Sequence, residues 1–187
     1  MNKDRVIALT DGIIAIAATI MVLELSVPST VSFETLSTQI PTFYAYIISF
    51  ALVYLSWRSH HNTFEKADHI DGKTFIINGI WVFFITLVPF VTDLIGNDPN
   101  NTLAAAIYIV TIFLWSFTFQ FLDIAIVDAN PGAERDEIRT NPPRAILFGS
   151  YGLAFIFCFI MPILSLAIIG IAIIAMTIAI FRSDSFK

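Results

Sequence analysis

Long apolar stretches alternate with short polar segments along most of the sequence. A helix that crosses a bilayer needs about 20 mostly apolar residues, and six stretches approach this length. They run over residues 5–27, 41–57, 74–95, 102–127, 143–161 and 163–181. The strands of a membrane β-barrel are about 10 residues long and alternate strictly, which these stretches do not. The pattern predicts an all-α integral membrane protein with six transmembrane helices.

Prolines and polar turn residues mark the expected ends of these helices. Pro28 follows the first stretch, and Pro41 suits the first turn of the second. The third and fourth stretches stop at residues 96–99 and 128–132, which are rich in Gly, Asn, Asp and Pro. Pro162 divides an apolar stretch that is too long for one crossing, so the last two helices are expected to form a tight hairpin.

Composition supports a membrane protein and excludes several other classes. The chain is 57% hydrophobic and 13% charged, whereas soluble domains are about half apolar and a quarter charged. Its net charge of −5 argues against a nucleic-acid partner. The loops are short, so residues 1–187 are expected to form a single six-helix domain. Cys158, the one cysteine, lies in an apolar run and is expected to be a packing residue.

Basic residues indicate the orientation. With six spans, all of them fall on the side that holds both termini, which the positive-inside rule places in the cytoplasm. The opposite side carries four carboxylates, which either raise the local cation concentration or only keep the loops hydrated. The basic residues are Lys3, Arg5, Arg58, Lys66, Lys73, Arg135, Arg139, Arg144, Arg182 and Lys187, and the acidic ones are Glu24, Glu34, Asp93 and Asp98.

Ionisable residues at membrane depth suggest function, because each costs at least a few kcal/mol there. Asp11 lies six residues, or about 9 Å, beyond Arg5. Arg5 can extend to the interface. Thr10 and Asp11 can instead cap a shorter helix, but too few residues would then remain before Pro28 to span comfortably. We therefore favour an embedded Asp11 that has partners on neighbouring helices.

Expected partners of these groups lie on the second and third helices. They are Trp57, His60, His61 and Asn78. Such groups either tie the helix bundle together or take part in gating. Adjacent residues on a helix point about 100° apart, so His60 and His61 do not converge on one metal ion. A histidine network can respond to cytosolic pH.

A stripe of branched side chains follows along the first helix. Ile16, Thr19, Ile20 and Leu23 have the spacing i, i+3, i+4, i+7 and share one side. They can line a narrow pore, although any lipid-facing or packed helix shows such a stripe. No Thr-Val-Gly-Tyr-Gly filter, arginine ladder, nucleotide-binding loop or hydrolase motif is present. We therefore expect no enzyme activity, no cofactor, no bound metal apart from a permeating ion, and no soluble substrate.

Taken together, these residues resemble a known family, the potassium channels related to transmembrane protein 175. The family signature Arg-x-x-x-Phe-Ser-Asp corresponds to residues 5–11, with Leu9 in place of Phe and Thr10 in place of Ser. Residues 12–24 also look like the first helix of the family. Trp57-x-x-His60-His61-x-x-Phe64 and Asn78 followed by Pro89-Phe90 extend the resemblance over the first three helices.

The resemblance implies a bacterial, single-repeat channel in the plasma membrane. Members of that branch form homotetramers in which four first helices surround a central pore. By position, Ile16 matches the hydrophobic constriction and Thr19 the polar layer one turn outward, while Ile20 and Leu23 extend the lining. The polar network of the signature comprises Arg5, Thr10, Asp11, Trp57, His60 and Asn78.

The expected function is a moderately selective, potassium-permeable cation channel with a hydrophobic side-chain constriction. Its partners are other copies of the chain and the lipid bilayer, and its permeant ion is K⁺, with other monovalent cations passing less well. The principal alternative is a secondary transporter or proton-coupled carrier in which Asp11 and His60 relay protons. A purely structural membrane subunit is a further alternative. A membrane enzyme would need a nucleophile or metal cluster that the sequence does not show.

Overall fold

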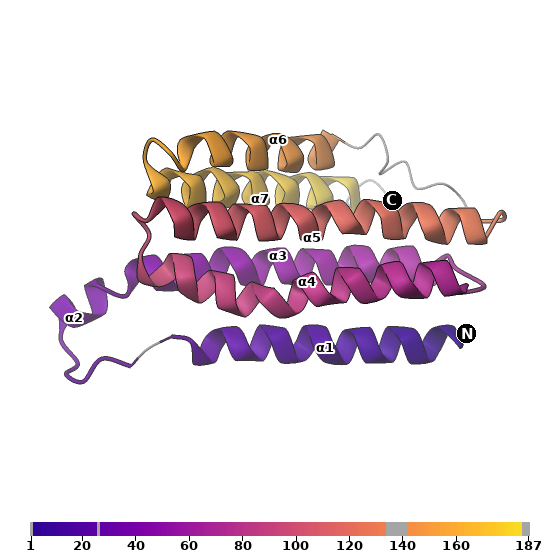
Figure 1. Ribbon diagram of the computed structural model, residues 1–187, viewed down its shortest axis with the longest axis horizontal. Helices are drawn as coiled ribbons and strands as arrows, with labels where there is room; N and C mark the ends of the chain where they lie inside the picture. Colours follow the sequence, from indigo (N-terminus) through magenta and orange to yellow (C-terminus); the bar gives the residue numbers. More distant parts are fainter. Residues whose placement is uncertain (1, 26, 134–141, 185–187) are drawn as a thin grey trace.

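Helices are the only regular elements in residues 2–25, 27–133 and 142–184, which the computed structural model describes. One of them is a single short turn of helix, and the others are long. In chain order they are α1 (Lys3–Leu23), α2 (Phe33–Ser37), α3 (Ile40–Glu65), α4 (Gly72–Asn97), α5 (Thr102–Ala129), α6 (Pro142–Phe157) and α7 (Pro162–Asp184) (Figure 1).

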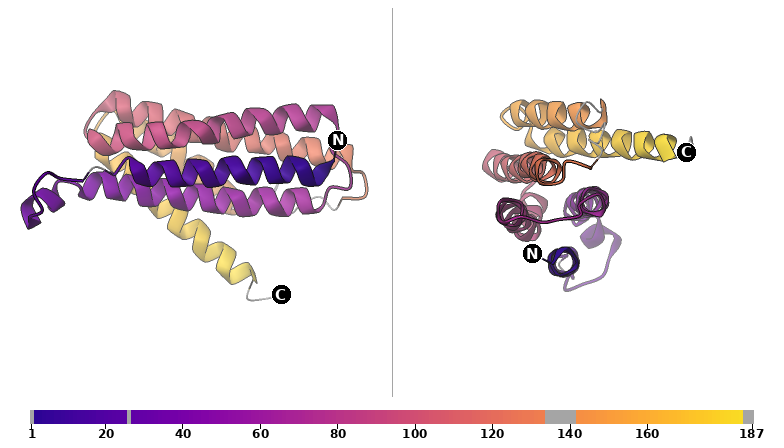
Figure 2. Two further views of the ribbon diagram at one scale, coloured as in Figure 1. Left: turned by 90° about the horizontal axis from the view of Figure 1, so that it is seen from below. Right: turned by 90° about the vertical axis from the view of Figure 1, so that its right-hand side faces the viewer.

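The long helices form an antiparallel bundle. In Figure 1, α1, α4 and α6 run in one direction, and α3, α5 and α7 run in the other. The end-on view in Figure 2 places α1 at one edge of the molecule and the α6–α7 pair at the opposite edge, with α3, α4 and α5 between them. α6 and α7 are tilted against the other helices in this view. α1 packs mainly on α4 and α3, so much of its surface has no neighbour within the chain.

Five described helices are long and apolar enough to cross a membrane. They are α1, α3, α4, α5 and the part of α7 over Pro162–Ile180. α6 has 16 residues and is therefore about 24 Å long, shorter than the hydrocarbon core of about 30 Å. The described residues therefore form an all-helical bundle with five helices of membrane-spanning length and one shorter apolar helix.

Three helix ends differ from the sequence prediction by four residues or more, and the first two belong to the first two long helices. The first helix was expected to reach Pro28 but ends at Leu23, and a short connection with α2 follows. The Ser32 side chain caps α2 by accepting a hydrogen bond from the N–H of Thr35. The second long helix was expected to end near Trp57 but continues to Glu65, because no Pro or Gly interrupts residues 58–65.

The hairpin break at Pro162 is observed, with a small shift. α6 was expected to reach Met161 and instead ends at Phe157, so the turn occupies the residues before Pro162. Pro cannot donate a backbone hydrogen bond and is favoured at a helix start, so it begins α7 rather than ending α6.

A buried polar cluster joins the three central helices. Ser49 of α3 hydrogen bonds to the Tyr108 hydroxyl of α5 at 3.0 Å, and the Thr92 hydroxyl of α4 donates to Ser49 at 2.7 Å. Since unpaired polar groups are costly in an apolar interior, this pairing favours one relative placement of the helices.

The described basic residues gather at one end of the bundle, together with several acidic ones such as Asp4, Glu65 and Asp71. These basic residues belong to helix ends and loops at the end where α1 begins, and the four acidic residues of the expected outer side belong to segments at the other end (Figure 1). Arg144 and Arg182 occur at the start of α6 and the end of α7. Arg135, Arg139 and Lys187 lie outside the described residues.

Candidate functional site

α1 has one side packed against its own chain and another side exposed. The stripe expected from the sequence lies on the exposed side, with exposed fractions of 59% for Ile16, 39% for Ile20 and 78% for Leu23. Thr19 is exposed as well. The buried side contacts α4 and α3 and comprises Val6, Thr10, Ile14, Ala17 and Met21.

A chain of hydrogen bonds anchors the buried side of α1 to two other helices. The Asn78 Nδ2 of α4 donates to the Thr10 hydroxyl at 2.9 Å, and the Asn78 Oδ1 lies 3.0 Å from the His60 Nε2 of α3. Because this amide places its oxygen toward His60, the imidazole donates from Nε2. All three side chains are buried, so the bonds fix the rotation of α1 against α3 and α4.

Aromatic rings enclose His60 on both sides. Its ring stacks on Trp81 with centroids 4.8 Å apart and on Phe64 at 4.2 Å. Its Nδ1 is buried without a hydrogen-bond partner among the described residues. Trp81 was not singled out in the sequence, although it lies three residues after Asn78 and so on the same side of α4.

A second contact connects α1 to α3 nearby. The Trp57 indole donates from Nε1 to the Asp11 carboxylate at 3.1 Å. Trp57 in turn stacks on the exposed His61 ring, with centroids 5.9 Å apart. The structure thus joins five of the six residues of the expected polar network into two hydrogen-bonded groups. One group is Thr10, Asn78 and His60, and the other is the pair Asp11 and Trp57.

Arg5 is the member that the structure does not bring to the others. It lies in the first turn of α1 and is exposed. No hydrogen bond links its guanidinium to another described residue of the network.

The hydrogen bonds between the described side chains do not link Asp11 directly to His60. Asp11 bonds to an indole N–H, which only donates, and His60 bonds to an amide. A relay needs groups that both accept and release protons, and no direct Asp11–His60 hydrogen bond occurs in this part of the described chain. The geometry therefore suits an anchor better than a proton-coupled carrier.

The Thr19 hydroxyl has a defined orientation on the exposed side of α1. It donates to the Ile16 carbonyl at 2.8 Å within its own helix. Since the proton is used in that bond, the lone pairs of the oxygen remain available to accept hydrogen bonds or to face a cation.

An open pocket lies beside the stripe, between α1 and α4. It has a volume of about 160 Å³. Ile16 and Ile20 form part of its wall, so these side chains have free space next to them. The remaining lining residues are Ile13, Ala17, Thr86 and Pro89.

The ends of α1 and α5 meet the loop between α3 and α4. The Lys3 ammonium donates to the Ala67 carbonyl at 2.7 Å. The Asn130 side chain accepts from the N–H groups of Asp68 and His69 and donates to the His69 carbonyl. These contacts connect residues 61 to 64 positions apart, and no local sequence motif signals them.

Comparison with known proteins adds an independent line of evidence. The family model described as endosomal/lysosomal potassium channel TMEM175 matches residues 5–89, which include α1, α3 and most of α4. This region contains the exposed stripe and the polar anchor, which is the set of hydrogen-bonded side chains of Thr10, Asp11, Trp57, His60 and Asn78. No group of three or more His, Cys, Asp or Glu side chains in the described ranges is placed to hold a metal ion.

Several similar bacterial proteins are named as potassium channels. A potassium channel of Chryseobacterium sp. (strain P1-3) is 34% identical over 127 residues, which cover 68% of this chain and 66% of the relative. A potassium channel of Chamaesiphon minutus is 34% identical over 113 residues, covering 56% of each chain. The alignments thus span about two thirds or less of these curated relatives. The zebrafish endosomal/lysosomal proton channel TMEM175 is 24% identical over 149 residues, 28% of its length.

The fold agrees over nearly the whole chain. The crystal structure of a lysosomal potassium-selective channel TMEM175 homolog from Chamaesiphon minutus has a TM-score of 0.77 and 29% sequence identity. The match covers 95% of this chain and 97% of that one, so it extends to the C-terminal helices that the family model does not reach. The sequence, the relatives and the fold agree, and the chain therefore belongs to the TMEM175 family.

Proposed function

We propose that this protein is a potassium-permeable, moderately selective cation channel whose pathway is lined by α1. The observation that carries the proposal is the placement of the expected lining on the exposed side of α1, while hydrogen bonds hold the other side to α3 and α4. The relatives named as potassium channels support the permeant ion.

The pathway is incomplete in one chain. α1 lies at an edge of the molecule, so its exposed stripe surrounds an axis only when several copies meet there (Figure 2). We propose a homotetramer in which four copies of α1 surround the pore. We further propose six crossings in the plasma membrane of a bacterium, with both termini in the cytoplasm and the carboxylates Glu24, Glu34, Asp93 and Asp98 at the outer mouth.

The constriction would act through side chains. A ring of Ile16 conducts when it is wide enough to remain wetted and closes by dewetting when it narrows. Selectivity then depends on the cost of partial dehydration and on oxygens such as that of the Thr19 hydroxyl, whose lone pairs remain available because its proton bonds to the Ile16 carbonyl. This mechanism gives a smaller preference for K⁺ over Na⁺ than a filter of backbone carbonyls.

Planar-bilayer recording tests the function. Purified protein in a bilayer that separates a K⁺ solution from a Na⁺ solution should give unitary current steps. The sign of the reversal potential should show that K⁺ is more permeable than Na⁺. A carrier would show transport without unitary steps, and a purely structural subunit would show no current. Either result would contradict the proposal.

Two substitutions test the lining. Ile16→Asn should raise conductance about threefold or more, because a polar ring stays wetted, and Thr19→Ala should move the K⁺/Na⁺ permeability ratio toward one. Thr177→Ala is the matched control, since its hydroxyl donates to the Ile173 carbonyl at 2.8 Å on α7 in the same way. If neither α1 variant differs from this control, α1 is not the lining.

A further inference from the structure

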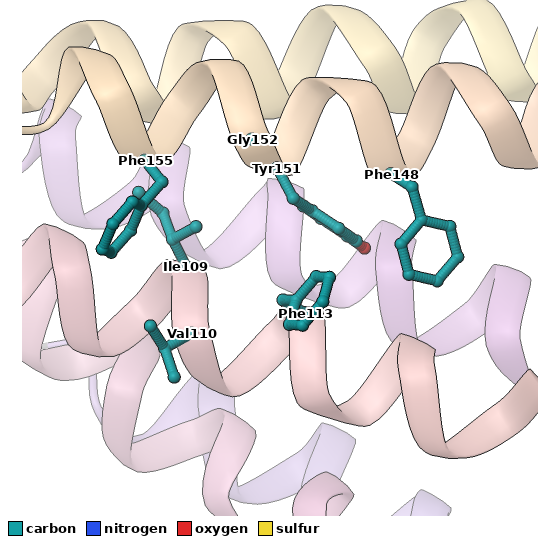
Figure 3. A pocket seen from close by; sticks show the side chains of 7 residues that line it. All are labelled: Ile109, Val110, Phe113, Phe148, Tyr151, Gly152 and Phe155. Carbon is teal, nitrogen blue, oxygen red and sulfur yellow. The ribbon is translucent and has the colours of Figure 1, made fainter.

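A second and larger pocket lies between α5 and α6, far from α1. Its volume is about 290 Å³, near the lower end of the range of about 300–1,000 Å³ found for small-molecule sites. Figure 3 shows side chains from both helices pointing into the space between them. The lining comprises Ile109, Val110, Phe113, Phe148, Tyr151, Gly152 and Phe155.

One wall of the pocket is a set of three rings packed edge to face. Phe113, Phe148 and Tyr151 pair with one another at centroid distances of 5.8 to 6.3 Å and interplanar angles of 83° to 89°. This is a favoured geometry for aromatic pairs. The contacts join α5 to α6, so the wall is a packed feature rather than a chance gap between loose side chains.

The pocket offers no free polar group to a ligand. Its one polar side chain, Tyr151, is buried, and its hydroxyl is paired with Ser116 at 2.9 Å. All other lining residues are apolar, and no charged residue is among them. A ligand with a hydrogen-bonding or charged group would lose hydration there without compensation, so the chemistry fits a saturated hydrocarbon chain.

The depth of the pocket along α5 indicates where such a hydrocarbon chain would come from. Ile109 and Phe113 lie 7 and 11 residues after the first residue of α5, Thr102, so they are about 10 and 16 Å along the helix. Half of the hydrocarbon core is about 15 Å thick. The pocket is therefore at the depth of the acyl chains of one leaflet, and on the proposed orientation this is the outer leaflet.

The mouth of the pocket opens away from the bundle. Val110 and Phe155 are 42% and 39% exposed, and Gly152 is exposed between them on the α6 side. The α6–α7 pair is at the edge of the molecule opposite α1, so copies that meet at α1 leave this edge facing lipid (Figure 2). We propose that the pocket between α5 and α6 is a binding site for one acyl chain of a membrane lipid. The inference rests on the orientation and the assembly given under the proposed function, but it does not depend on ion conduction.

Gly152 provides a direct test of this site. A Cβ added at Gly152 meets nothing within 4 Å, so a side chain can start there, and Gly152→Leu adds bulk to the wall of the pocket. Gly149 on the same helix is also exposed and free of neighbours within 4 Å, but it does not line the pocket. Gly149→Leu is therefore the matched control.

The probe is phosphatidylcholine with a photoactivatable diazirine in the middle of one acyl chain. The full-length protein is reconstituted in vesicles of this lipid, irradiated and mapped by mass spectrometry. The wild type should carry more label on pocket residues than on Ile171, which is 67% exposed at a similar distance along α7. Gly152→Leu should lower the pocket label about fivefold or more, because leucine occupies the volume, and Gly149→Leu should leave it unchanged.

Three results would overturn the proposal. Equal labelling of the pocket and Ile171 would mean ordinary surrounding lipid, and a pocket label below that of Ile171 would mean that protein covers the site. If the Gly152→Leu protein folds and its pocket residues are labelled as strongly as in the wild type, the label does not come from lipid in the pocket. Val110→Trp fills the pocket from the α5 side and provides this last test if Gly152→Leu does not fold. Because labelling needs no current, its outcome is separate from that of the channel recordings.

Discussion

Asn78 has the central position among the polar side chains that orient α1. Its amide donates to Thr10 and faces His60 with its oxygen, so one side chain connects α1, α3 and α4. Each of these partners is buried and has few alternatives in an apolar bundle. The exposed stripe keeps its orientation only while this contact is intact.

Removing the Asn78 amide should therefore be costly. Asn78→Ala leaves His60 and Thr10 unpaired, and we expect a loss of about 2–4 kcal/mol in stability, since each buried unpaired group costs about 1–3 kcal/mol. Trp57→Phe removes one hydrogen bond to the half-buried Asp11 and should cost less. Thermal unfolding in detergent compares the two variants. Equal melting temperatures for Asn78→Ala and the wild type would show that the network does not hold α1.

At the scale of the helices, α3 and α4 approach each other closely near the outer end of α4. A Cβ added at Gly96 would be 3.0 Å from the Thr42 Cα, and the Thr42 hydroxyl donates to the Gly96 carbonyl at 3.0 Å. Backbone atoms cannot move aside as a flexible side chain can. Glycine is thus required at this crossing.

Gly96→Ala should force these helices apart and destabilise the protein by about 1–3 kcal/mol, the usual cost of overpacking. Gly79→Ala on the same helix is the control, because nothing lies within 4 Å of its added Cβ. That change should be neutral or should stabilise by up to about 1 kcal/mol through helix propensity. Chemical unfolding measures both, and a Gly96→Ala variant as stable as Gly79→Ala would contradict the close crossing.

The start of α4 carries a pH-dependent cap outside the membrane-spanning part. The Thr74 N–H donates to the Asp71 carboxylate at 2.7 Å and holds the pKa of that carboxyl below its usual value. A depressed carboxyl pKa stabilises the fold above the pKa of the unfolded chain, and this contribution is lost as pH falls through the folded pKa.

Asp71→Asn isolates this effect, because asparagine caps a helix about as well but does not titrate. Between pH ~7 and ~3 the melting temperature of the wild type should fall more than that of Asp71→Asn, with the gap developing below about pH 4. Parallel curves for the two proteins would show that the cap does not contribute in this way.

The sequence predicted the long helices well because hydropathy and proline positions act locally. It missed α2, since a five-residue helix has no hydrophobic period to detect, and it ended α3 at about Trp57 or slightly beyond because charged residues follow. The apolar stretch on both sides of Pro162 is too long for one crossing and so predicted the hairpin, but it did not predict the short α6. Helix ends depend on caps and turns that averaged hydropathy does not resolve.

The residues of the polar anchor were identified from the sequence, but their pairing was not. Spacing placed Asp11 and Thr10 on α1 and left several partners open. In the structure, Trp57 donates a hydrogen bond to Asp11 and Asn78 donates one to Thr10. Contacts such as that of Lys3 with Ala67 depend on the packing of distant segments and leave no local pattern.

At the scale of the whole molecule, the exposed stripe of α1 predicts self-association. One chain has a mass of 20.8 kDa, so the proposed tetramer has a protein mass of about 83 kDa. Native mass spectrometry after gentle removal of detergent should give this mass as the main species. A monomer or dimer under conditions that preserve channel activity would contradict the fourfold arrangement.

The central claim is that Ile16 faces water in a pathway between copies of α1. Ile16→Cys tests it, with Ile171→Cys as control, because the parent side chains are 59% and 67% exposed in one chain. The only native cysteine, Cys158, is buried. A thiol reacts as the thiolate, which forms in water and not in lipid. A positively charged thiol reagent should block the current of Ile16→Cys, more slowly at high K⁺, and leave Ile171→Cys unaffected. An Ile16→Cys channel that keeps its full current under the reagent would contradict the account.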